Sequence, residues 1–217
     1  MKDNCRIKEL QERIRKICYC CYTHSDIDEY SEHREIICPF DELLQVAKEL
    51  ARVNAKSAIN TLVQIASDIA SSPCYDFDIV LGLSCIAEAM AIIDIDSGAK
   101  IIKILNEIIY LISRVGLAYI CEEALVRITR VMIKLYERGF KAVENILEQL
   151  LSPILKISNY CEFDPEILFN VCRLLTQTEI QEGYQLFSCL DTCFWDDLMI
   201  FMSSLKKIGT KVSIVSK

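Results

Sequence analysis

Apolar residues recur along most of the chain at intervals of three and four, which places them on one face of an α-helix. The first such stretch covers about 4–22, where the apolar residues follow a heptad and charged residues fill the other faces. A polar segment with one short helix follows, and Pro39 then opens a longer series. The period predicts further helices near 40–53, 56–71, 78–93, 97–115, 119–138, 140–158, 165–176, 180–194 and 195–208.

Residues with defined roles at helix ends mark several of these boundaries. Gly139 lies where a helix commonly ends in a left-handed residue. Asp96 or Ser97 is suited to cap the helix that follows, because short polar side chains accept from free backbone N–H groups. Pro153 falls inside an apolar run and removes a backbone donor, so we expect that helix to kink or break near Leu151.

The composition agrees with an all-α protein. Among 217 residues, 52% are hydrophobic and 25% charged, so the chain has enough apolar side chains for a core. Six glycines and four prolines are too few for the turns of an all-β fold. The length suits one large domain or a short array of repeats.

A nine-residue pattern repeats within the predicted helices. Segments beginning at Val46, Ile86 and Ile128 match position by position, and a fainter copy begins at Val171. Each of the first three leads through a short turn into a second apolar helix, beginning near Ala58, Ala99 and Ala142. Pairs of helices repeated every 40 to 43 residues bury their apolar faces by stacking.

This pattern predicts a short right-handed α-solenoid of about four to five stacked antiparallel helical hairpins. An irregular helical bundle is the alternative. Residues 1–39 would form a capping helix with a polar segment, residues 40–208 the repeat array, and residues 209–217 a flexible basic tail.

The segment IAEAMAIID, residues 86–94, resembles the alanine-rich helical-hairpin repeats of archaeal and bacterial proteins, which are similar to tetratricopeptide and HEAT arrays. The resemblance covers about 40–208. It implies a scaffold that binds a partner, and it brings no catalytic residues with it.

Hydropathy and charge indicate where in the cell the protein is located and which classes of molecule it binds. The N-terminus has no apolar segment typical of a signal peptide, and charged residues interrupt the most apolar stretches, 79–93 and 101–112, so we expect a cytoplasmic protein without a membrane span. The net charge of −7 disfavours nucleic acid as the main ligand. A mean hydropathy of +0.26 suggests that a partner or a second copy covers an apolar face.

One basic stripe stands out against this acidic background. At helical spacing it comprises Arg127, Arg130, Lys134, Arg138 and Lys141. Such a stripe binds an acidic partner or a phosphate backbone, or else forms a solvated face on which Glu123 pairs with Arg127.

Twelve cysteines are spread over nearly the whole chain, which does not fit a small disulfide-stapled fold. Thiolate and imidazole ligands suit zinc, and Cys18, Cys20, Cys21 and His24 are close enough in sequence to share a metal. A zinc or redox sensor is therefore one hypothesis for the N-terminal segment. Simple burial is the other, because Cys18 and Cys21 lie on the apolar stripe of the first helix.

No enzyme template fits the chain. A phosphate-binding glycine loop, a nucleophile elbow and an HExxH motif are all missing from the sequence. We therefore predict a non-enzymatic interaction module for a protein or peptide partner. The alternatives are binding of nucleic acid or an acidic partner through the basic stripe, and metal or redox sensing through the N-terminal Cys/His cluster.

Overall fold

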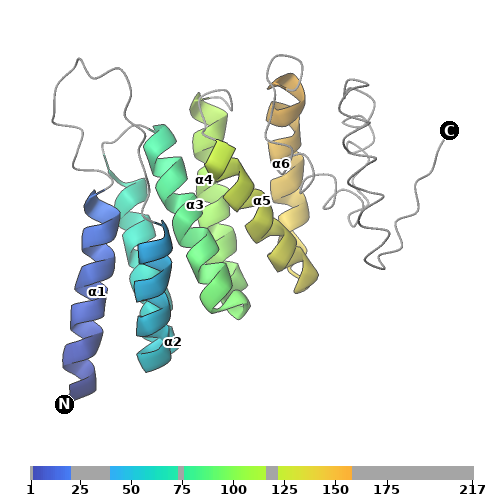
Figure 1. Ribbon diagram of the computed structural model, residues 1–217. Coiled ribbons are helices and arrows are strands. Elements are labelled where there is room, and N and C mark those ends of the chain that lie inside the picture. The colour runs from blue at the N-terminus through green and yellow to red at the C-terminus, as the bar shows by residue number, and fades with distance from the viewer. Residues whose placement is uncertain (1, 21–39, 73–75, 116–121, 158–217) are drawn as a thin grey trace, which may run out of the picture.

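The computed structural model describes residues 2–20, 40–72, 76–115 and 122–157 (Figure 1). Within these ranges the chain forms six α-helices and one short 3₁₀ turn, and no strand, so the all-α prediction is confirmed. The predicted helices at 165–176, 180–194 and 195–208, the polar segment before Phe40 and the tail 209–217 lie outside the described residues.

The observed elements follow the predicted boundaries closely. They are α1 (Lys2–Cys20), α2 (Phe40–Ala70), α3 (Asp76–Ile93), the 3₁₀ turn η2 (Ile95–Ser97), α4 (Gly98–Val115), α5 (Glu122–Glu137) and α6 (Ala142–Ile157). None of these helices combines the length and the apolar character that crossing a bilayer requires.

Helix α2 consists of two helices joined at Asn54, where the sequence predicts a boundary between 53 and 56. The backbone of Asn54 is extended (φ −159°, ψ 100°), which interrupts the helix. Its side-chain Oδ1 accepts a hydrogen bond of 2.8 Å from the backbone N–H of Ser57. Asn54 therefore caps the second half of α2.

The predicted caps of α4, Asp96 and Ser97, lie in the short 3₁₀ turn η2 that directly precedes this helix. Asp94 is the N-cap of this turn: its side chain accepts from the backbone N–H of Asp96 at 3.2 Å and from the Ser97 hydroxyl at 2.7 Å. Asp94 and Asn54 are both the ninth residue of their nine-residue segments. The two segments therefore end in the same way, with a short polar side chain that caps the next helical turn.

Gly139 ends α5 in the predicted way, with a left-handed backbone (φ 91°). The Gly139 N–H donates to the Tyr136 carbonyl at 2.8 Å, and the Phe140 N–H donates to the Leu135 carbonyl at 3.0 Å. These two bonds are the Schellman pattern, which satisfies carbonyls left free at a helix end.

The aromatic ring after this turn packs on the start of α4. A Cβ placed on Gly98 would lie only 2.3 Å from the Cζ of Phe140, which is too close for two carbon atoms. The ring can pack here because residue 98 has no side chain.

The sequence predicts a kink or break near Leu151; the helix does not break there, since α6 continues to Ile157. Proline removes only one backbone donor, and the helix is held by its apolar face, whose members are fully buried: Val143, Ile146, Leu147 and Leu150. Tertiary packing of this face outweighs the local cost of the proline.

Helix α3 lies at the centre of the described structure. It packs against α2, α4 and α5, while α1 packs on α2, and α6 packs on α4 and α5. Figure 1 shows the helices following one another in a row from α1 to α6. Every residue from 83 to 91 in α3 is buried, because neighbours surround it on several sides. One continuous core connects the helices from Leu10 to Leu150.

Candidate functional site

A buried ion pair joins the middle of α3 to α5. The guanidinium Nη1 of Arg127 donates to the Glu88 carboxylate at 2.5 Å, and both side chains are nearly inaccessible, at 11% and 6% exposed. The second terminal nitrogen of Arg127 donates to Glu123, one helical turn earlier in α5. The predicted Glu123–Arg127 pair is therefore present, with Glu88 as a further partner.

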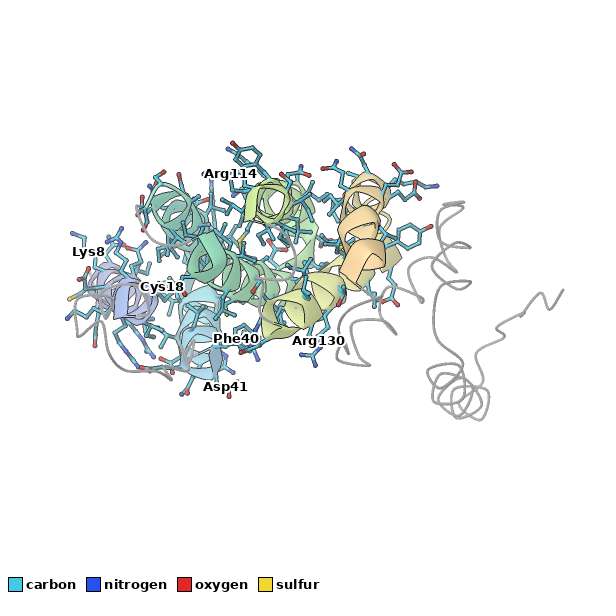
Figure 2. The ribbon with its side chains drawn as sticks, turned by 90° about the horizontal axis from the view of Figure 1, so that it is seen from above. Lys8, Cys18, Phe40, Asp41, Arg114 and Arg130 are labelled. Carbon is cyan, nitrogen blue, oxygen red and sulfur yellow. The ribbon has the colours of Figure 1, made fainter. Side chains whose placement is uncertain are left out.

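Two other side chains complete this group. The Phe40 ring at the start of α2 lies 3.8 Å from the Arg127 guanidinium carbon, and Arg130 approaches Glu88 at 3.9 Å. In the view from above, Phe40 and Arg130 lie on the same side of the helices (Figure 2). An aromatic face over a guanidinium attracts its charge and keeps water away from it. The group, which we call the Glu88–Arg127 cluster (Phe40, Glu88, Glu123, Arg127, Arg130), links α2, α3 and α5.

The electrostatics of this cluster favour a permanently charged arginine. Burial by itself lowers the pKa of Arg127, but Cys85 and the hydrogen-bonded carboxylates of Glu123 and Glu88 raise it by more, so the pKa ends above its ordinary value. The Nε of Arg127 is buried without a hydrogen-bond partner among the described residues. The Arg127 guanidinium therefore donates to the carboxylates of Glu88 and Glu123, and the cluster holds α5 against α3.

The fold separates the residues of the predicted basic stripe. Arg127 is buried, Arg130 is partly exposed beside Glu88, and Lys134 is half-buried. Arg138 donates through two nitrogens to Asp96, at 2.8 and 3.2 Å, and Lys141 is exposed. Arg127 is too deeply placed to contact a ligand, so the five cations do not form one continuous surface.

The sequence contains one indication that Arg127 has a second ionic partner besides Glu123. Glu88 is the lone carboxylate inside the apolar run 79–93, and a buried charge requires a partner. The partner is 39 residues away, which no helical spacing relates to Glu88.

The candidate metal ligands lie mostly outside the described part of the chain. Cys18 is buried in the core, the Cys20 side chain is not described, and Cys21 and His24 lie outside the described residues. In the described ranges, no three His, Cys, Asp or Glu residues are grouped as a metal site would need. Cys5, Cys18 and Cys85 are not in disulfides.

A second feature lies on the outward side of α4. Tyr110 is 57% exposed, and the Arg114 guanidinium lies over its ring, 5.9 Å from the centroid. The opposite side of α4 is fully packed into the core. We call the exposed side the α4 outer face, which comprises Lys103, Asn106, Tyr110, Ser113 and Arg114. The apolar residues of 101–112 dominate the local sequence, so its pattern gave no sign of this exposed face.

In comparisons with known proteins, no protein family, curated protein or solved structure matches this chain.

Proposed function

We propose that the chain is a helical-repeat interaction module. Its hairpins would stack into a short right-handed α-solenoid, similar in architecture to tetratricopeptide and HEAT arrays, and its surface would bind a protein or peptide partner. The packing of helices two apart in sequence supports this arrangement, since α3 contacts α5 and α4 contacts α6. Stacked hairpins make such contacts between equivalent helices of successive repeats.

The observation that carries the proposal is the equal burial of matched positions. The first, second and fifth residues of the three nine-residue segments are all at most 1% exposed: Val46, Ala47 and Leu50, Ile86, Ala87 and Met90, and Ile128, Thr129 and Met132. Residues that match in sequence are therefore equally buried in the first half of α2, in α3 and in α5, which would be the first helices of three successive hairpins. This is the expectation for one repeated unit and a coincidence for an irregular bundle.

The charges favour a protein partner over nucleic acid. Arg127 and Arg138 are paired with carboxylates inside the chain, and the net charge is −7. A nucleic-acid surface needs several cations that are available to phosphates. Sensing of a metal or of redox state by the N-terminal cysteines stays a separate hypothesis, which one equivalent of zinc bound by the purified chain would support.

Affinity capture from native lysate of the source organism tests the proposal. The full chain is used as bait, with one half of the lysate treated with nuclease, and captured proteins are identified by mass spectrometry. We expect a stoichiometric protein that survives nuclease treatment. Recovery that disappears with nuclease, and in the Arg130→Glu/Lys134→Glu variant, would replace the proposal with nucleic-acid binding.

A further inference from the structure

We propose that the α4 outer face binds an acidic segment of a partner protein, with Tyr110 as the central contact. The inference rests on the proposed function, since it names the surface and the partner chemistry of the interaction module.

The α4 outer face is contiguous by helix geometry. Lys103, Tyr110 and Arg114 are separated by seven and four residues, so they lie within about 40° of one another around the helix axis. Asn106 and Ser113 lie next to this line, and all five side chains are exposed. An extended or helical peptide running along α4 would meet all of them.

Tyr110 is the natural centre of such a contact. Among the described residues, only Ile92 (36% exposed) and Tyr110 (57%) are large hydrophobic side chains with substantial exposure. Tyrosine and arginine are the residue types most enriched among those that dominate binding energy at interfaces. The contact with Arg114 restricts the ring before a partner arrives, which reduces the entropy lost on binding.

The charge of this surface indicates an acidic partner. Lys103 and Arg114 flank Tyr110 along the helix, and Lys100, which donates to Asn60 at 3.0 Å, adds a third cation one turn before. Glu107 is the one acid among these positions and is half-buried. This surface is therefore positive in a chain whose net charge is −7, so an acidic segment gains both attraction and faster encounter.

The same charges are too few for duplex DNA. The span from Lys103 to Arg114 is about 16 Å, along which a duplex presents about ten phosphate charges. Two or three cations neutralise a small part of these charges. A peptide with a few carboxylates and an aromatic or aliphatic side chain matches both components of the surface.

Fluorescence anisotropy with the purified full chain tests this inference. The probe is a labelled copolymer of glutamate and tyrosine; polyglutamate and a DNA duplex of equal charge serve as comparison probes. We expect the copolymer to bind more tightly than either comparison, and salt to weaken it. Tyr110→Ala and Arg114→Glu should each weaken copolymer binding about tenfold or more, the effect of losing a central interface residue.

Matched controls come from exposed positions elsewhere. Ile92→Ala removes the other exposed apolar side chain, and Arg52→Glu reverses an exposed charge on α2. Both should change binding less than twofold. Circular dichroism and unfolding midpoints check that all four variants fold like the wild type.

Three results would overturn the inference. They are copolymer binding that is insensitive to Tyr110→Ala, DNA binding with the same sensitivity to both variants, and self-association that Tyr110→Ala abolishes, which would identify a second copy as the occupant. The same variants then enter the lysate capture. A partner retained equally by wild type and by Tyr110→Ala removes this surface and leaves the proposed function intact, whereas no partner for the wild type removes the proposed function itself.

Discussion

Two ion pairs connect the same parts of this protein in opposite surroundings. Glu88 of α3 pairs with Arg127 of α5, and Asp96 of η2 pairs with Arg138 just after α5. The donor–acceptor distances are 2.5 and 2.8 Å. The first pair is 6% and 11% exposed, the second 67% and 57%. An arginine–carboxylate hydrogen bond is therefore made once inside the core and once in water.

The comparison shows that the surroundings, more than the contact itself, determine what an ion pair contributes. In water, solvent and salt screen the Asp96–Arg138 attraction, and the two side chains lose conformational freedom by pairing. In the core, burial of Glu88 and Arg127 costs the solvation free energy of both charges, which their mutual attraction offsets. Removal of either partner therefore leaves an uncompensated buried charge and destabilises the fold. The buried pair thus fixes how α5 is placed against α3, while the exposed pair adds little.

Replacement of Glu88 should have the largest effect. Glu88→Gln leaves the Arg127 charge buried with only the half-exposed Glu123 as an ionic partner, so we expect a loss of about 3 kcal/mol in the free energy of unfolding. Urea unfolding followed by circular dichroism measures it. Glu123→Gln is the matched control, with an expected loss of about 0.5 kcal/mol. Equal losses for the two variants would mean that burial does not govern the pair.

The double variant Glu88→Met/Arg127→Met tests whether the ion pair stabilises the fold more than two apolar side chains would. The alternative is that each charge is needed only because the other is buried. Removing both charges leaves no unpaired ion in the core, so most of the loss seen in Glu88→Gln should be recovered. A double variant less stable than Glu88→Gln would show instead that the pair itself stabilises the fold.

Asp78, a half-buried carboxyl on α3, is intermediate in exposure between the buried Glu88 and the exposed Asp96. Burial raises its pKa to about 6 from an ordinary value of 3.8. Its contribution to stability is therefore fully present below pH 4 and is lost as the pH rises through about 6. Asp78→Asn should exceed the wild type in stability above pH 6, by about 1 kcal/mol because solvent screens part of the effect, and match it near pH 4. Urea titrations at pH 4, 5, 6 and 7 test this; a constant difference over that range would contradict it.

Asp96→Asn should have the smallest effect. The hydrogen bond and the charge of Arg138 lower the pKa of Asp96, so the contribution of this pair is present above pH 4 and is lost as the pH falls below the native pKa. We expect no resolvable change in the urea midpoint at 0.15 M salt, and a small decrease at low salt. A loss as large as that of Glu88→Gln would break the distinction between the two pairs.

Several features of the fold could be predicted from local sequence. The helices, the boundary at Asn54, the end of α5 at Gly139 and the Glu123–Arg127 pair all depend on residues within one or two turns of one another. Local chemistry did not predict the 3₁₀ turn that Asp94 caps before α4, and it overestimated the effect of Pro153, since α6 continues to Ile157.

The sequence by itself thus determined the helical class and the positions that form the core, because periodicity and capping are local. Only the tertiary structure decided that Arg127 belongs to Glu88 and not to a binding stripe, and that Tyr110 lies in water while its neighbours in the same apolar run are buried. The physical reason is that burial depends on which helices pack together, and the spacing within one helix says nothing about a partner 39 residues away on another helix.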